Sequence, residues 1–393
     1  GLFIYDHLAK RNTLPASKAI EFNSDSVLNS SITQGFEYAD GWVDDARLVI
    51  LNAQAAHNLG ATIATRTRCI KAIRNSDYWD VILEQQASKQ HLNIKAKSIV
   101  NAAGPWVASL FEDVFTQPTP HTVRLVKGSH IVVPRIHSQP VAYILQNEDN
   151  RIVFVIPYEQ DYSLIGTTDE EYTGDITDVK ISEQEIEYLI SITNHYFKKP
   201  ISEADIVHTF SGVRPLLDDK STDAQAVTRD YKLILNNEAD HAPLLSVFGG
   251  KITTYRKLAE NAVNKLAPFY PKMSGSWTKN TPLPGGDFSN QAYLIAQLES
   301  SYPWLPTDTL KRMTRSYGTL SYQLLGKSQA IGDLGYHFGH GLYAQEVDYL
   351  VNHEWAKSSA DILWRRTKLG LRFTEKQVIA LGQYLTKHPA CHS

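Results

Sequence analysis

The stretch of sequence that decides the fold is Leu244-Leu245-Ser246-Val247-Phe248-Gly249-Gly250-Lys251-Ile252-Thr253-Thr254. Its apolar first half predicts a buried strand that Gly249-Gly250 end, and a helix is expected to begin at Thr253 or Thr254. That helix carries one apolar stripe, made of Tyr255, Leu258, Ala262 and Leu266. A strand, two glycines and a helix N-terminus let the main chain approach an anionic or electron-rich ligand, to which Lys251 would add a charge. A tight turn with a solvated lysine explains the same letters, and spacing alone does not separate the two interpretations.

A second buried strand is predicted upstream, over residues 98–103, and it stops at Gly104-Pro105-Trp106. A helix that begins at Asp44 or Asp45 and ends at Gly60 precedes it, followed by three strand-like runs, 61–70, 78–84 and 92–95. This order is typical of the later half of a nucleotide-binding α/β domain. Because α/β sheets bind ligands at the carboxyl ends of their strands, the small residues before Pro105 would let a flat cofactor lie close. A well-packed strand end is the alternative.

Between these two strands the pattern changes to short alternating runs, which predict an antiparallel sheet. The expected strands are 122–134, 142–146, 152–157, 162–168 and 208–213, with a helix over 182–197 and Pro215 ending the last strand. An antiparallel sheet inserted into an α/β domain is therefore expected. Beyond a linker at 282–287, helical periodicity over 290–390 predicts a separate helical domain.

Three side chains of the inserted region suggest chemistry. Arg214 stands between Gly212 and Pro215, and Arg229 follows an acidic loop; a guanidinium suits phosphate or carboxylate. Pairing with nearby acids such as Asp218, Asp219 and Asp230 is the simpler interpretation of both arginines. His130 could act as a base near neutral pH, although a lone histidine in a strand is more often structural.

The acidic strand end Gly166-Thr167-Thr168-Asp169-Glu170-Glu171 allows a divalent-ion site, but its spacing matches no cation loop. A solvated turn is favoured there. In the helical region, residues 364–368 with Trp355 could touch an anionic membrane surface, and a buried aromatic core is the favoured alternative.

Composition narrows the class of protein. The chain has 393 residues and a formal net charge of −3, so no overall basic field attracts nucleic acid. Two cysteines, Cys69 and Cys391, are too few for a disulfide framework or a zinc site, which favours a reducing compartment. No apolar run approaches the roughly 18 residues of a membrane span.

Taken together, these segments resemble the FAD-dependent, quinone-linked glycerol-3-phosphate dehydrogenases of the bacterial aerobic type. The resemblance covers essentially the whole chain and is carried by six segments, Gly35–Tyr38 with Trp42–Leu48, Val100–Trp106, Lys127–Pro134, Ile165–Asp169, Ser211–Pro215 and Phe248–Lys257. One departure is large: the Gly-x-Gly-x-x-Gly turn with which the family binds the FAD pyrophosphate is not in this sequence. The resemblance implies that roughly 100 residues precede Gly1 in the complete protein, and that the chain as given does not bind FAD tightly alone.

The resemblance implies a mixed α/β fold: the remainder of a Rossmann-like FAD-binding domain, an inserted antiparallel-sheet substrate domain and a C-terminal helical domain. The expected ranges are 1–40 with the substrate region, 41–118 and 244–281 for FAD binding, 119–243 for substrate, and 288–393 for the helices.

The same resemblance assigns roles to individual residues. It places His130, Arg214 and Lys251 in catalysis and Arg214, Arg229 and Lys251 in substrate binding. The implied contacts to FAD come from Arg68, Cys69, Ala102, Ala103, Gly104, Gly249, Gly250, Lys251, Ile252, Thr253 and Thr254. No metal is implied.

The implied activity is oxidation of sn-glycerol 3-phosphate to dihydroxyacetone phosphate, with electrons passed through FAD to a membrane quinone. The protein would be cytoplasmic, attached peripherally to the inner face of the cytoplasmic membrane, and a homodimer is possible. Two alternatives stay open: a glycerol-3-phosphate oxidase that uses O2, and a non-catalytic fragment, since the pyrophosphate motif is absent.

Overall fold

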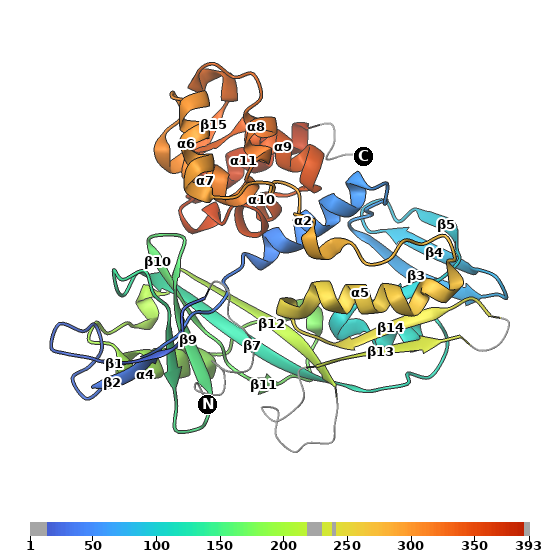
Figure 1. Cartoon of the computed structure of the whole chain (residues 1–393), viewed down its shortest axis with the longest axis horizontal. Coiled ribbons are helices and arrows are strands. Elements are labelled where there is room, and N and C mark those ends of the chain that lie inside the picture. Colours follow the sequence, from blue (N-terminus) through green and yellow to red (C-terminus); the bar gives the residue numbers. More distant parts are fainter. Residues whose placement is uncertain (1–13, 218–229, 238–240, 389–393) are drawn as a thin grey trace. The chain divides into compact units, whose positions relative to one another are not determined.

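The computed structural model describes residues 14–217, 230–237 and 241–388 (Figure 1). The chain divides into two compact units. The first contains Gly1–Trp42, Cys69–Glu84 and His91–Pro271, and the second contains Val43–Arg68, Gln85–Gln90 and Lys272–Ser393. Each unit has its own hydrophobic core.

The larger sheet of the first unit is antiparallel and lies between the two α/β strands in the sequence, as predicted. Its strand order is β11 (Glu170–Glu171), β7 (Val123–Pro134), β10 (Tyr162–Gly166), β9 (Ile152–Tyr158) and β8 (Tyr143–Gln146), and β12 (His208–Leu217) pairs with the other side of β7. Helix α4 (Glu183–Tyr196) packs on this sheet, because Leu189 is fully buried among Ile131, Val155 and Ile165. Alternating apolar residues in the strands supply that buried face.

Pro215 does not end its strand, which corrects the prediction from sequence. β12 continues to Leu217, and Pro215 lies opposite Leu125 of β7. Proline lacks the N–H that a central strand must donate, but an edge strand tolerates it when that position points away from the neighbour. β12 is such an edge, since among the described strands it pairs only with β7.

The α/β part of the first unit is built on a three-stranded sheet in the order β13 (Tyr231–Asn236), β14 (Leu244–Gly249) and β6 (Ile99–Asn101). β14 is parallel to β6, and β13, which the sequence pattern missed, is antiparallel to β14. Helix α5 (Tyr255–Leu266) covers one face through Ala262 and Leu266, which pack on Leu245 (Figure 1). Leu244 and Phe248 fill the opposite face.

Two smaller sheets complete the first unit. β3 (Thr67–Arg74), β4 (Trp79–Gln85) and β5 (His91–Ala96) form the meander predicted from the sequence, and β3 begins at the boundary between the two units. β1 (Lys18–Glu21) and β2 (Gln34–Glu37) form a hairpin in a stretch where only short elements were expected. After β6 come a 3-10 turn, η1 (Gly104–Trp106), and the short helix α3 (Ser109–Asp113).

The second unit is helical, as predicted. Its helices are α2 (Asp45–Asn58), α6 (Gln291–Ser301), α7 (Thr307–Tyr317), α8 (Leu320–Leu325), α9 (Ala344–Glu354), α10 (Ser359–Arg365) and α11 (Glu375–Lys387). A small hairpin, β15 (His337–Gly339) with β16 (Leu342–Tyr343), joins them. Asp44 caps α2 as expected, accepting from the Arg47 N–H. However, α2 lies with the C-terminal helices, whereas the expected range 41–118 groups it with the FAD-binding part.

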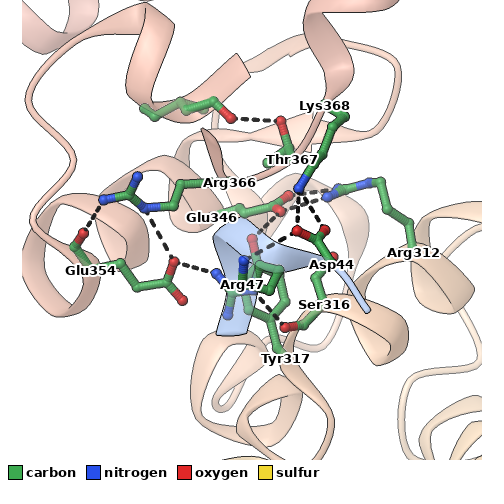
Figure 2. Close-up of polar contacts among 11 residues, drawn as sticks. Asp44, Arg47, Arg312, Ser316, Tyr317, Glu346, Glu354, Arg366, Thr367 and Lys368 are labelled. Atoms are coloured by element: carbon green, nitrogen blue, oxygen red, sulfur yellow. Dashed lines mark hydrogen bonds and ion pairs between the residues drawn. The ribbon is translucent and has the colours of Figure 1, made fainter. Parts of the chain in front are cut away.

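A buried ionic cluster fastens α2 to the C-terminal helices (Figure 2). Arg47 Nη1 lies 2.5 Å from Glu354 Oε2, and Lys368 Nζ lies 2.5 Å from both carboxylate oxygens of Asp44. Arg312 donates two hydrogen bonds of 2.6 Å to Glu346. Arg366, Thr367 and Lys368 are buried, so this part of the stretch 364–368 belongs to the interior of its unit. Arg365 is exposed and pairs with Asp361. In the described parts of the chain, no helix has the length and apolar character that a membrane span requires.

Candidate functional site

The carboxyl ends of β6 and β14 lie side by side in the first unit. Parallel pairing places Ser246 opposite Asn101, so both strands end at the same edge of the sheet. β6 is followed by Ala102, Ala103 and Gly104, and β14 leads into Gly250. The prediction that these two strand ends come together is confirmed. This edge is where an α/β sheet binds its ligand.

Glycine is required at the turn after β14. Gly249 and Gly250 have φ angles of +72° and +111°, which L side chains rarely adopt. A Cβ at Gly249 would also lie 2.7 Å from the Asp230 carbonyl oxygen. The next residues, Lys251 to Thr254, are exposed and form the 3-10 turn η4 (Ile252–Thr254) before α5. The main chain of this turn is therefore accessible to a ligand.

The turn after β6 has a matching form. Gly104 has a φ of +58°, and a Cβ there would meet no atom within 4 Å. Asn101, which is buried, holds the turn by donating from Nδ2 to the Val107 carbonyl at 2.9 Å. Adjacent strand ends thus carry two glycine turns, one with open space at Gly104 and one where the main chain leaves room only for glycine at Gly249. Such turns suit a flat cofactor that lies against main chain, which is the fit expected for a flavin.

β12 brings a guanidinium to the same region, since it lies next to η1 and β14 in the fold. Arg214 Nη1 donates to Asp169 Oδ1 at 2.6 Å, and Nη2 donates to Thr167 Oγ1 at 3.0 Å. The side chain of Arg214 keeps about a third of its surface exposed. The acid that holds it thus comes from the loop after β10. Asp218 and Asp219, which the sequence offered as partners, lie outside the described residues.

Gly128 makes room for this guanidinium. A Cβ at Gly128 would lie 2.6 Å from Arg214 Nη2 and 2.6 Å from Thr167 Oγ1. Gly212, its partner on β12, has open space around the same position. The absence of a side chain at Gly128 is therefore a requirement of the site.

His130 lies on the same strand as Gly128 and faces the same side of the sheet. Its ring stacks on Phe210 with centroids 4.8 Å apart and planes 11° from parallel. A Cβ at Gly166 would lie 2.3 Å from its Cδ2, so this ring too depends on a neighbouring glycine. Burial, with a smaller contribution from the Arg214 charge, lowers the pKa of His130 to about 4. The imidazole is therefore neutral at neutral pH and available to accept a proton, although a pKa near 4 makes it a weak base.

The structure gathers some of the predicted residues and leaves others apart. His130 and Arg214 lie together, with the Arg214 charge acting on the imidazole. Lys251 is exposed at the start of η4, and no contact among the described residues joins it to that pair. Arg68 and Cys69 lie in β3, in a different sheet from the glycine turns. Arg229 lies outside the described residues.

The prediction of a solvated turn over residues 166–171 is wrong. Thr168 is fully buried, and Thr167 and Asp169 hold Arg214. Among the described residues, no group of three or more His, Cys, Asp or Glu side chains could hold a metal ion. The acidic residues of this segment predicted exposure to solvent. Only the pairing of β12 with β7 brings Arg214 next to Asp169 and Thr167.

Comparison with known proteins gives two family matches that together span most of the chain. Residues 7–256 match the family "FAD dependent oxidoreductase", and residues 276–384 match "C-terminal domain of alpha-glycerophosphate oxidase". The chain is 51% identical to a glycerol-3-phosphate dehydrogenase of Pseudomonas aeruginosa, with 99% of this chain and 76% of that protein covered. It is 50% identical to the aerobic glycerol-3-phosphate dehydrogenase of Escherichia coli, over 99% of this chain and 78% of that protein.

Two further matches are a relative named for a different sugar-alcohol phosphate and a solved structure. A D-erythritol 1-phosphate dehydrogenase of Brucella abortus is 45% identical, over 98% of this chain and 77% of that protein. In structure, the chain resembles the glycerol-3-phosphate dehydrogenase of Bacillus halodurans complexed with FAD, with a TM-score of 0.73, 24% identity, and 92% of this chain and 76% of that one covered. This likeness agrees with the mixed α/β fold and the C-terminal helical domain. The chain belongs to the family of FAD-dependent glycerol-3-phosphate dehydrogenases, and its cofactor is FAD.

Proposed function

We propose that the protein oxidises sn-glycerol 3-phosphate to dihydroxyacetone phosphate and passes the electrons to a membrane quinone. The observation that carries this proposal is the position of Arg214: a partly exposed guanidinium next to a neutral histidine, on the strand that adjoins the two glycine turns. Oxidation of a secondary alcohol on a phosphate ester needs an anion-binding group and a proton acceptor, and Arg214 and His130 are groups of these two kinds.

The proposed roles follow from the charges. Arg214 binds the substrate anion or stabilises the developing alkoxide, because a guanidinium stays protonated in proteins. His130 takes the hydroxyl proton, since burial keeps its imidazole neutral. By the resemblance alone, Lys251 would help Arg214 to stabilise the alkoxide, and Arg229 would help to hold the phosphate. FAD, when bound, supplies the hydride acceptor that no side chain provides.

The proposed flavin contacts are made by the two glycine turns. Ala102, Ala103 and Gly104 would lie against one part of the ring system, and Gly249 to Thr254 against another. The exposed turn at η4 and the N-terminus of α5 would favour the negative charge of a reduced flavin. Arg68 and Cys69 keep the role on the adenine side as a proposal that rests on the resemblance alone.

The electron acceptor and the cellular location form the second part of the proposal. A quinone acceptor requires contact with the membrane surface, which we propose to be peripheral and on the cytoplasmic side. A homodimer also remains a proposal, which sedimentation equilibrium would test.

The deciding experiment uses the complete protein, purified with FAD and mixed with glycerol 3-phosphate without oxygen. We expect the substrate to bleach the flavin absorbance at roughly 450 nm, because hydride transfer reduces FAD. A dye acceptor should then reoxidise the flavin and restore the absorbance. Absence of bleaching would reject the dehydrogenase. An oxygen electrode then separates a dehydrogenase from an oxidase, because only the oxidase consumes O2 during turnover.

Two further measurements address the remaining alternatives. D-erythritol 1-phosphate is the second substrate to test, because a relative of 45% identity is named for it. Faster bleaching by that compound than by glycerol 3-phosphate would replace the proposed substrate within the same reaction class. An absorbance scan of the chain as given tests the fragment alternative, which colourless protein supports.

A further inference from the structure

A buried carboxylate lies behind the site, on the opposite face of the sheet. Glu185, near the N-terminus of α4, has 1% of its surface exposed. Its Oε1 accepts hydrogen bonds from Ser129 Oγ at 2.8 Å and Thr168 Oγ1 at 2.6 Å. Its Oε2 accepts from the Ser182 N–H at 2.7 Å and lies 2.9 Å from Lys127 Nζ. One carboxylate therefore receives four donors from three separate segments of the chain.

These contacts keep Glu185 ionised within the protein. Burial alone would raise the pKa of Glu185, but the hydrogen bonds from Thr168, Ser182, Lys127 and Ser129 together lower it below its usual value. Lys127 is buried as well and has Glu170 as a second partner at 3.3 Å. A buried charge with this many partners is expensive to disturb, since removing any one leaves the others unsatisfied.

The strand geometry connects this carboxylate to the site. Side chains alternate between the two faces of a strand, so Lys127 and Ser129 point toward α4 while Gly128 and His130 face the site. On β12 the same alternation places Ser211 on the α4 face, where its Oγ lies 2.9 Å from Ser129 Oγ. Each of these residues on the α4 face is thus one position from a residue on the site face.

The loop after β10 repeats the relationship. Thr168, which donates to Glu185 and accepts from the Ser129 N–H at 2.9 Å, stands between Thr167 and Asp169. Those two neighbours are the residues that hold Arg214. Glu185 therefore bonds directly to the two segments whose adjacent residues set the positions of Arg214 and His130.

We propose that Glu185 is a positioning residue that fixes the substrate-binding geometry of Arg214 through Thr168 and Ser129, without touching the substrate. The proposal rests on the function proposed above, in which Arg214 contacts the substrate anion. It differs from a simple stabilising role because the effect must pass through Arg214. Each carboxylate oxygen of Glu185 accepts from two donors. In Glu185→Gln one of these oxygens becomes an NH2 group, which donates hydrogen bonds and would therefore face two donors, whichever oxygen is replaced.

The test is Glu185→Gln in the complete enzyme with FAD. We expect the KM for glycerol 3-phosphate to rise about tenfold or more, in line with the loss of well-made hydrogen bonds, while FAD content stays at the wild-type level. The matched control is Leu189→Ala, which weakens the same helix one turn further on but leaves the carboxylate in place. If Glu185 only stabilises the fold, KM should depend on the loss of melting temperature alone. Glu185→Gln and Leu189→Ala would then have equal KM values wherever their melting temperatures fall equally, and that result would contradict the proposal.

A double-mutant cycle with Arg214→Ala makes the path of the effect measurable. If Glu185 acts through Arg214, adding Glu185→Gln to Arg214→Ala changes KM by less than twofold, far below its effect in the wild type. Multiplicative effects on KM would overturn the proposal, as would a wild-type KM in the single variant.

A second pair of variants keeps the proposal testable if Glu185→Gln fails to fold. Thr168→Ser retains the hydroxyl that donates to Glu185, whereas Thr168→Val has nearly the same shape and lacks it. We expect Ser to preserve KM and Val to raise it; equal KM values would contradict the proposal. Failure of the proposed function is recognised separately, because the wild-type enzyme itself would then not be reduced by glycerol 3-phosphate.

Discussion

Asp169 holds Arg214 across the site: Oδ1 of the carboxylate lies 2.6 Å from Nη1 of the guanidinium. The two residues are 45 positions apart in the chain. The pair orients the guanidinium before any substrate arrives, so less side-chain freedom is lost on binding.

Replacement of the guanidinium should severely reduce activity. We expect Arg214→Ala to lower kcat/KM roughly 30- to 4,000-fold, which corresponds to about 2–5 kcal/mol of lost transition-state stabilisation. The reason is the loss of a desolvated contact to a phosphate or alkoxide. Steady-state kinetics with a dye acceptor measures this. Arg151→Ala, which breaks an ion pair with Asp149, is the control and should change kcat/KM by little. Near-normal kinetics for Arg214→Ala would remove this residue from the site.

A methyl group at position 128 should have a similar consequence without changing any charge. Gly128→Ala would place its Cβ about 2.6 Å from Arg214 Nη2, so the guanidinium must move. We expect a higher KM for the substrate, measured by steady-state kinetics. Gly212→Ala is the matched control, since Gly212 lies directly opposite on β12 and has open space. Equal KM values for the two variants would show that the space at Gly128 is not needed.

The buried histidine predicts a pH dependence of stability. The pKa of His130 is about 4 in the folded protein, whereas an unfolded histidine titrates near 6.5. Between these values the unfolded state binds more protons, so this group's contribution is complete above pH 6.5 and is lost as the pH falls toward 4. His130→Gln should therefore lose less stability than the wild type between pH 7 and pH 4.5, measured by urea unfolding. Parallel losses in both proteins would argue against the lowered pKa.

The turn after β14 should control FAD retention. In Gly249→Ala the new Cβ would meet the Asp230 carbonyl at 2.7 Å, at a φ of +72° that alanine disfavours. We expect the complete protein to be purified with less bound FAD, measured by the ratio of absorbance near 450 nm to that near 280 nm as rough markers of flavin and protein. Gly275→Ala, at a site with no atom within 4 Å, should retain full FAD content. Full retention in Gly249→Ala would place the flavin away from this turn.

The ionic cluster of the second unit should contribute strongly to its stability. Arg47→Met leaves the fully buried Glu354 without its closest cation, which we expect to cost about 3–5 kcal/mol of unfolding free energy. Combining it with Glu354→Leu should recover much of that loss, because no unpaired carboxylate then remains. Thermal unfolding measures both. A single variant as stable as the wild type would show that the pair is not a stabilising contact.

Much of the fold follows from local patterns. Strand β14, its two glycines and helix α5 were readable because burial, turn conformation and helical periodicity each leave a mark within a few residues. The same holds for α4, whose Ser182–Glu185 capping box lies inside four residues. Pro215 misled for the complementary reason: a proline is tolerated only if its strand lies at an edge, and no local pattern reveals which strand is the edge.

The sequence by itself therefore determined the inserted antiparallel sheet, the C-terminal helices, the two glycine turns and the family, although no local pattern predicted β13. Only the tertiary structure decided that Asp169 is the acid that holds Arg214 and that Thr168 is buried. It also decided that Glu185 accepts hydrogen bonds from Thr168 and Ser129. These pairings join residues far apart in the chain, and hydrogen bonds and ion pairs form over a few ångströms of space, whatever the number of residues that separate their partners.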